Sequence, residues 1–203
     1  MLISFEGIDG CGKSTQIRLL TEWLDSKNLS YHLFREPGGT EISEKIRSLL
    51  LHETDEMHPV TELLLFSAAR SQLIYERVQP LLEGREVVLL DRFYDSTTAY
   101  QGFGRNSAEI DEIEQLHTLA THGISPDLTF YLRLDPEIAM KRTGEQKDRM
   151  EKAGLTFFRK VSEGYDQIAS REERFITLDS SQPKGLIHRM IIDAVKSHPG
   201  LLA

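Results

Sequence analysis

The sequence predicts an α/β protein with a doubly wound, five-stranded parallel sheet flanked by helices. Short, mostly apolar β-prone runs alternate with helical patterns along the whole chain, which is typical of parallel sheets with helical crossovers. A glycine-rich loop, residues 7–14, directly follows the first run and opens the first helix. Ligands of such sheets bind beyond the carboxyl ends of the strands, so functional residues are expected there.

Five strands and eight helices are expected. The predicted strands span residues 1–6, 30–35, 86–90, 128–134 and 175–178. The segment 86–90 is a near-continuous apolar run, which indicates a parallel strand buried on both faces. Apolar residues at helical spacing predict the helices, which span 15–24, 41–51, 60–82, 96–101, 109–122, 136–143, 155–170 and 186–196. No repeat or low-complexity linker divides the chain, so we expect one domain over residues 1–203.

Composition limits the partners that the chain can have. The formal net charge is −8, so no basic surface favours nucleic acid. No apolar run approaches membrane-spanning length, and the early first strand leaves no room for a signal peptide. The single cysteine, Cys11, rules out an internal disulfide, which fits a reducing compartment. We therefore expect a cytoplasmic protein with neither nucleic acid nor membrane as a partner.

The glycine-rich loop matches the phosphate-loop pattern G-x-x-x-x-G-K-[ST]. Its glycines let successive backbone N–H groups point into one concavity at a helix N-terminus, which favours anions. In such loops the lysine, here Lys13, reaches the β- and γ-phosphates, and the next hydroxyl, Ser14, lies on a magnesium ion. The residues predicted to bind a nucleoside triphosphate are Gly7, Ile8, Asp9, Gly10, Cys11, Gly12, Lys13, Ser14 and Thr15.

A second charged site, Asp91 and Arg92, follows the third predicted strand. An acidic residue at this strand end faces the phosphate loop and can hold magnesium through its water shell. Arginine prefers to fork onto phosphate or carboxylate, so Arg92 is a candidate phosphate ligand. An Asp91–Arg92 ion pair that closes the strand is the alternative, and the two interpretations are compatible.

Asp91 opens the run Asp91-Arg92-Phe93-Tyr94-Asp95-Ser96-Thr97-Thr98-Ala99-Tyr100-Gln101-Gly102, which closely resembles the signature of thymidylate kinases. Further stretches that resemble motifs of this family are 5–10, 35–40, 62–70, 125–129 and 148–151, in that order. Together they cover nearly the whole chain. The resemblance implies a P-loop nucleoside monophosphate kinase-like fold with a small lid. It also implies a homodimer that transfers the γ-phosphoryl group of ATP to dTMP with Mg²⁺.

The resemblance implies an acceptor site, residue by residue. Asp9 is similar to an acidic residue that contacts the sugar 3′-hydroxyl, and an N-cap role is its alternative. Phe66 and Arg70 lie four residues apart, hence on one helix face, and resemble a base-stacking ring and a base-edge donor. A core role for Phe66 and a solvated one for Arg70 are the alternatives. The other implied substrate-binding residues are Arg47 and Arg92 near the monophosphate, Ser96 and Thr97 at the base edge, and Tyr100 and Gln101 along the sugar and base.

Residues 142–153 are charged, contain glycine and resemble the lid of the family. Bacterial members with glycine at the position of Gly10 tend to supply a catalytic arginine from this lid. Arg142 and Arg149 are therefore predicted catalytic residues beside Lys13 and Arg92, with a merely solvated charge run as the alternative.

The predicted reaction requires no general base. The second pKa of a phosphate monoester is about 6, so the acceptor phosphate is already mostly dianionic near neutral pH.

The sequence leaves three other functions open. A kinase for another nucleotide or nucleoside is the nearest, although Phe66, Arg70 and Gln101 argue for thymine. A GTPase switch would carry an Asn-Lys-x-Asp motif after a late strand, and the sequence has none. A protein that binds nucleotide without turnover is disfavoured, because the phosphate loop and the Asp91–Arg92 pair are complete.

Overall fold

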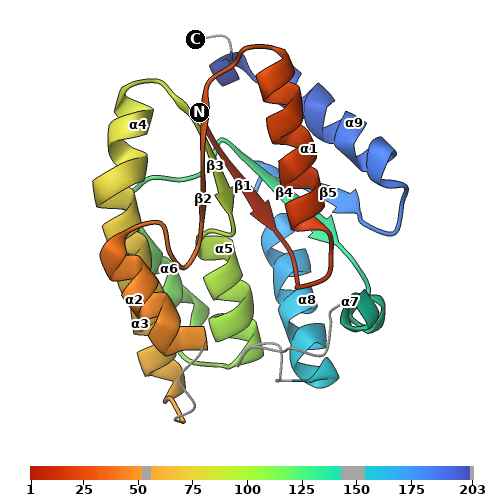
Figure 1. Cartoon of the computed structure of the whole chain (residues 1–203). Coiled ribbons are helices and arrows are strands. Elements are labelled where there is room, and N and C mark those ends of the chain that lie inside the picture. Colours follow the sequence, from red (N-terminus) through yellow and green to blue (C-terminus); the bar gives the residue numbers. More distant parts are fainter. Residues whose placement is uncertain (52–55, 143–153, 202–203) are drawn as a thin grey trace.

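The computed structural model describes residues 1–51, 56–142 and 154–201, and its strands form one five-stranded parallel sheet (Figure 1). The strands are β1 (Leu2–Glu6), β2 (Tyr31–Arg35), β3 (Val87–Asp91), β4 (Leu128–Arg133) and β5 (Phe175–Asp179). Their spatial order is β2-β3-β1-β4-β5. The sequence-based prediction of five parallel strands is confirmed, and each predicted strand end lies within one residue of the observed one.

The register of the sheet places the functional strand ends together. Phe5 in the central strand β1 is paired with Asp91 of β3 on one side and with Phe130 of β4 on the other. The chain that leaves β1 after Glu6 therefore emerges beside the end of β3. This is the edge at which ligands of open parallel sheets bind, and in Figure 1 it points toward the bottom of the view.

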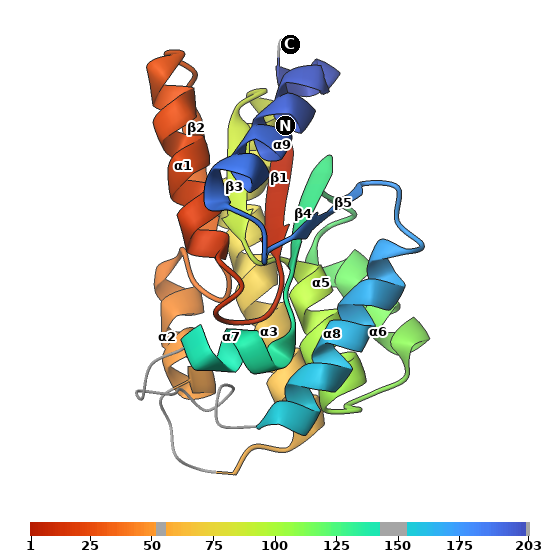
Figure 2. The same cartoon turned by 90° about the vertical axis from the view of Figure 1, so that its right-hand side faces the viewer.

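Helices connect the strands and cover both faces of the sheet. The described helices are α1 (Lys13–Ser26), α2 (Glu41–Leu51), α3 (Pro59–Leu73), η1 (Ile74–Val78), α4 (Gln79–Glu83), α5 (Tyr94–Thr97), η2 (Thr98–Gly104), α6 (Ile110–Ala120), α7 (Pro136–Arg142), α8 (Leu155–Ala169), α9 (Lys184–Ser197) and η4 (Pro199–Leu201). Figure 2 shows α1 and α9 on one side of the sheet, with α5 and α8 on the other. The arrangement is doubly wound, as predicted.

Alternate side chains of the strands enter two apolar clusters. Ile3 and Leu89 join the cluster that also contains side chains of α1, α8 and α9. Leu2 and Val88, one residue earlier in each strand, join a smaller cluster with side chains of α3 and η1. These strand residues are buried, which agrees with the near-continuous apolar runs in the sequence. The resulting sheet is a rigid support for the loops at its carboxyl edge.

Two helix predictions are wrong in detail, and π-helical turns are the reason. The segment 60–82 is not one α-helix, because the π-turn Ile74–Val78 interrupts it before Pro80. Proline lacks the backbone N–H that a regular α-helix would use, and a wider turn absorbs that interruption. The predicted helix 96–101 is likewise part of a longer segment that ends in the π-turn Thr98–Gly104. Gly104 faces α8 there, where a Cβ would lie 2.5 Å from the Phe157 ring.

Most of the predicted lid lies outside the described residues. This holds for residues 143–153, including Arg149. Within the part of the chain that the structure describes, no helix is both long and apolar enough to span a bilayer.

Candidate active site

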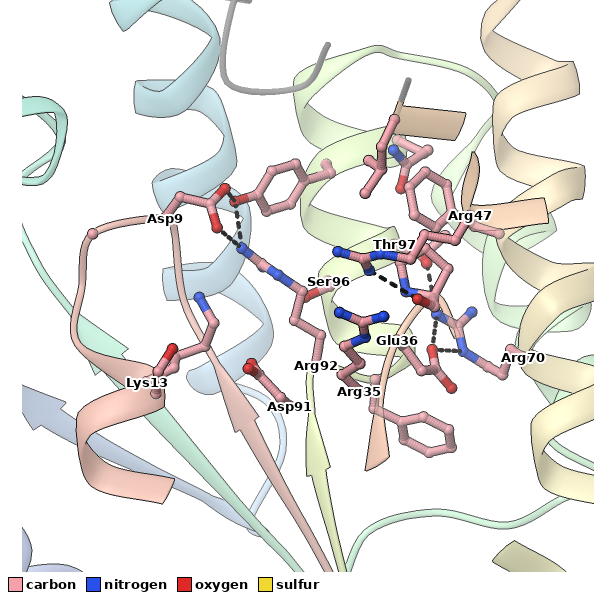
Figure 3. A pocket seen from close by; sticks show the side chains of 18 of the residues that line it. Asp9, Lys13, Arg35, Glu36, Arg47, Arg70, Asp91, Arg92, Ser96 and Thr97 are labelled. Atoms are coloured by element: carbon pink, nitrogen blue, oxygen red, sulfur yellow. Dashed lines mark hydrogen bonds and ion pairs between the residues drawn. The ribbon is translucent and has the colours of Figure 1, made fainter. Parts of the chain in front are cut away.

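A cavity of about 420 Å³ opens at the carboxyl edge of the sheet. It is lined by the phosphate loop, the end of β3, the α5–η2 segment, α3 and the loop after β2 (Figure 3). The predicted site residues that line it are Asp9, Gly10, Gly12, Lys13, Ser14, Thr15, Arg47, Phe66, Arg70, Asp91, Arg92, Ser96, Thr97, Tyr100, Gln101 and Arg142. Gly7, Ile8 and Cys11 belong to the same loop but do not line the cavity. One pocket thus holds nearly all residues that the sequence singled out.

The phosphate loop is built from glycines in conformations that other residues rarely adopt. Gly7, Gly10 and Gly12 have φ values of +133°, +80° and +100°. A Cβ at Gly7 would lie 2.7 Å from the carbonyl oxygen of Leu132, so a side chain there would separate the loop from β4. Gly12 precedes α1 and offers no side-chain cap to it. The first N–H groups of α1 are therefore left for an anion.

Lys13 is held inside the loop. Its Nζ donates to the carbonyl oxygens of Gly7 at 2.9 Å and Ile8 at 3.2 Å, and the residue is buried. Ser180, at the end of β5, donates to the carbonyl of Cys11 from the other side. This bond ties the loop to the chain just after β5, and Lys13 lines the cavity.

Arg92 crosses the middle of the site in a left-handed backbone conformation, with φ +72°. Its guanidinium pairs with Asp9 at 2.5 Å and donates to the carbonyl of Gly7 at 3.0 Å. Tyr100 lies under it, with the ring centroid 5.0 Å from the guanidinium carbon. Among these described residues the ion pair is Asp9–Arg92, and the alternative Asp91–Arg92 pair is not formed. Burial acts to raise the pKa of Asp9, but the charges of Arg92 and Lys13 prevail and lower it to about 2.

Glu6 supports Arg92 through Ser96, a role that was not predicted from the sequence. The carboxylate is fully buried and accepts hydrogen bonds from Phe93 N at 2.7 Å, Ser96 Oγ at 2.6 Å and Tyr165 OH at 2.9 Å. Ser96 Oγ in turn accepts from Arg92 at 3.1 Å. Burial, reinforced by the charge of Asp95, raises the pKa of Glu6 to about 7. The position of Glu6, a charged residue at the end of the mostly apolar strand β1, is the sequence feature that could have indicated this role.

The far end of the cavity is organised around Arg70, which is only 1% exposed. Its Nε donates to Glu36 at 2.8 Å, and a terminal nitrogen donates to Thr97 at 2.9 Å. The solvated-face alternative for Arg70 is therefore wrong. Burial raises the pKa of Glu36, against the opposing effect of Arg70. Figure 3 shows this pair across the cavity from Lys13, with Arg92 between them.

Other predicted acceptor residues surround this end. Phe66, one turn before Arg70 on α3, lines the cavity with a half-buried side chain. Arg47 of α2 donates to the carbonyl of Pro37 at 2.8 Å and also lines the cavity. Gln101 donates from Nε2 to Glu62 at 2.9 Å. Glu36 and Glu62 were not predicted to act here, although each is an acidic residue inside a motif that resembles the family.

Metal ligands are few in the described part of the chain. Asp91 and Ser14 both line the cavity, and Asp91 Oδ1 is buried with no hydrogen-bond partner in the protein. No cluster of three or more His, Cys, Asp or Glu side chains suited to a metal occurs among the described residues. A cation here would need ligands from outside the protein. Magnesium commonly takes such ligands from substrate phosphates and water.

Comparison with known proteins identifies the family. A model of the thymidylate kinase family matches residues 5–191. The chain is 47% identical over 210 residues to a thymidylate kinase of Chlorobium limicola, covering 97% of this chain and 94% of that protein. It is 44% identical over 198 residues to one of Thermoanaerobacter pseudethanolicus, covering 97% of each. The crystal structure of a thymidylate kinase from Ehrlichia chaffeensis matches with a TM-score of 0.78 at 33% identity, covering 97% of this chain and 98% of that one. The P-loop nucleoside monophosphate kinase-like fold is confirmed, and the chain belongs to the thymidylate kinase family.

Proposed function

We propose that this chain is a thymidylate kinase that transfers the γ-phosphoryl group of ATP to dTMP and releases ADP and dTDP. The observation that carries the proposal is one cavity that joins a phosphate loop to a ring and hydrogen-bonding side chains suited to a pyrimidine. Membership of the family and the near-complete match to its named relatives support it.

The acceptor nucleotide would lie between α3 and the α5–η2 segment. Phe66 offers a ring for the base to stack on, and Arg70 offers donors to a base carbonyl. Tyr100 lies under Arg92, where its ring restricts the space at the sugar 2′ position and favours deoxyribose. Asp9, which the nearby cations keep ionised, would accept a hydrogen bond from the 3′-hydroxyl.

The donor triphosphate would occupy the glycine loop, with Thr15 and the amides of α1 beside it. The residues present fit a magnesium ion: Asp91 Oδ1 is buried and lacks a partner, and Ser14 lines the same wall. We propose that these two residues hold Mg²⁺, directly or through water. When bound, the ion would supply positive charge that neutralises the phosphate groups.

The chemistry requires positioning and charge neutralisation rather than a general base. Lys13 and Arg92 flank the space between the two nucleotides and would neutralise the transferred group. Ser96 helps to orient Arg92, because its Oγ accepts from that guanidinium. Arg142, exposed at the end of α7, lines the cavity and could reach a phosphate. Arg149 stays a prediction from the sequence alone.

We infer a homodimer, because Val60 and Leu64 of α3 and Leu119 of α6 are exposed apolar side chains on helices near one another. Sedimentation velocity would test this, and a monomer at assay concentrations would contradict it.

The cytoplasm stays the expected location, since Cys11 is a buried free thiol and thiols persist in reducing compartments.

A coupled assay of ADP release tests the activity. The chain would be supplied with ATP and Mg²⁺ and with dTMP, dUMP, dCMP, dGMP or thymidine in turn. We expect the highest kcat/KM with dTMP, and dTDP as the product by mass spectrometry. Greater activity with another acceptor would mean a different nucleotide kinase, and no turnover with any acceptor would contradict the proposal.

A further inference from the structure

Glu62, which accepts a hydrogen bond from Gln101, has no role in the function proposed above. Glu62 lies in the first turn of α3, one turn before Phe66 and two turns before Arg70. Residues four apart share a helix face, so Glu62 continues the row that faces the base end of the cavity. It is 1% exposed although charged. A buried carboxylate is costly unless it is paired and hydrogen-bonded, so its partners indicate what it does.

A hydrogen bond and an ion pair meet at the same oxygen of Glu62. Gln101 Nε2 donates to Oε1 at 2.9 Å, and Arg105 Nε lies 3.5 Å from that oxygen in an ion pair. An ionised carboxylate can only accept hydrogen bonds, whereas an amide has one accepting and one donating end. The carboxylate therefore distinguishes the two ends of the Gln101 amide. The donating end is fixed toward Glu62.

The accepting end of the amide is then the one available to a ligand, because Gln101 lines the cavity. Arg70 lines the same region and can only donate. One of its terminal nitrogens, NH1, is buried without a hydrogen-bond partner in the protein. The base end thus combines one acceptor, from Gln101, with donors from Arg70.

This pattern matches one kind of pyrimidine edge. Thymine and uracil carry a donor at N3 and an acceptor at O4, whereas cytosine carries an acceptor at N3 and a donor at N4. We propose that Glu62 determines the choice of acceptor base by fixing the orientation of the Gln101 amide. The inference rests on the proposed function. It makes Glu62 a positioning residue that excludes cytosine without touching the nucleotide.

The test replaces the carboxylate of Glu62, which can only accept hydrogen bonds, by an amide that can pair with Gln101 in either orientation. In Glu62→Gln the partner amide can donate or accept, so Gln101 can turn and offer N–H to the cavity. We expect the ratio of kcat/KM for dTMP over dCMP to fall by about tenfold or more, as for a mispaired hydrogen bond in a binding site. The ratio for dTMP over dUMP should not change, because both bases share the N3–O4 edge.

Two variants separate orientation from general damage. The double variant E62Q/Q101E moves the carboxylate across the pair and again offers an acceptor to the cavity, so it should restore the preference for dTMP. Asp127→Asn is a matched carboxylate-to-amide change at a group that accepts from Leu2 N at 2.7 Å. It should leave the dTMP:dCMP ratio as in the wild type.

The outcomes are distinct. If Glu62→Gln lowers kcat/KM for dTMP, dUMP and dCMP by one common factor, Glu62 has only a structural role and the inference is overturned. If that variant does not fold in a thermal melt, Gln101→Met decides, because it keeps Glu62 and removes the acceptor. A dTMP:dCMP ratio that stays unchanged in Gln101→Met overturns the inference, and a fall supports it. Failure of the wild-type chain to phosphorylate dTMP would instead contradict the proposed function.

Discussion

The two ends of the cavity are built in different ways. The phosphate end uses backbone groups of a glycine loop, one lysine and the ends of two strands. The base end uses side chains of helices, and buried carboxylates orient them: Glu36 holds Arg70, and Glu62 holds Gln101. Backbone geometry suits a ligand group that all nucleotides share. Selection among bases requires side chains, and each polar side chain needs a partner that fixes its direction.

The difference predicts that changes at the base end affect folding as well as activity. Arg70→Ala leaves the buried Glu36 without its cation, and we expect the free energy of unfolding to fall by about 3–5 kcal/mol. Urea unfolding would measure this. In the double variant R70M/E36Q, which removes both charges, much of the loss should be recovered. An Arg70→Ala protein as stable as the wild type would show that the pair does not support the fold.

At the phosphate end the expected effect is on rate. Lys13→Ala removes a positive charge from the site of transfer, and we expect kcat to fall by about 10²–10³-fold. Single-turnover kinetics would measure the chemical step. The same factor should apply to every accepted monophosphate, because this end does not contact the base. A loss that depends on the acceptor would break the division between the two ends.

Glu6 connects the two ends through Ser96 and Arg92, and its titration should appear in stability. Burial raises its pKa from 4.5 to about 7, so the folded state keeps a proton that the unfolded state has released. The stability that protonation of Glu6 provides is therefore complete below pH 4.5 and is lost as the pH rises through about 7. Relative to Glu6→Gln, the wild type should lose up to about 3 kcal/mol over this window.

Urea unfolding of both proteins across the same pH range would measure the difference. The difference in the free energy of unfolding between wild type and Glu6→Gln should change only between pH 4.5 and about 7. A difference that is constant across the range would mean that Glu6 does not titrate on unfolding.

The smallest expected effect is on binding of the base. Phe66→Ala removes the stacking surface, and we expect KM for dTMP to rise about tenfold while kcat changes little. Steady-state kinetics would separate the two constants. Because Phe66 is only half buried, the melting temperature should stay close to that of the wild type. A fall in kcat without a change in KM would place Phe66 outside the base site.

The same contrast explains how far the sequence could be interpreted. The phosphate loop was predictable from the pattern alone, because glycine spacing specifies the backbone and the flanking strand and helix give its context. Phe66, Arg70 and Gln101 were identified only through resemblance to a family. Their supporting carboxylates were missed, because Glu36 lies 34 positions from Arg70 and Glu62 lies 39 positions from Gln101, and such distant contacts leave no local pattern.

The fold shows the same limit. Apolar runs identified all five strands and their parallel arrangement. Apolar periodicity could not reveal the π-turn at Ile74–Val78 or that at Thr98–Gly104, because such a turn shifts side-chain directions without changing composition. The second of these turns carries Tyr100 and Gln101, so the misjudged helix coincides with the base end of the site. Local rules of structure are often broken where function requires it.

The central claim is that the phosphate end sets the rate and the base end sets the choice of acceptor. The most direct test is the ratio of kcat/KM for dTMP over dCMP in wild type, Lys13→Ala and Arg70→Lys. We predict that Lys13→Ala lowers kcat/KM for dTMP and kcat/KM for dCMP by the same factor, so that their ratio is unchanged. Arg70→Lys keeps the charge near Glu36 but loses the planar donor fork, so the ratio should fall. A ratio that changes in Lys13→Ala and is retained in Arg70→Lys would contradict the account.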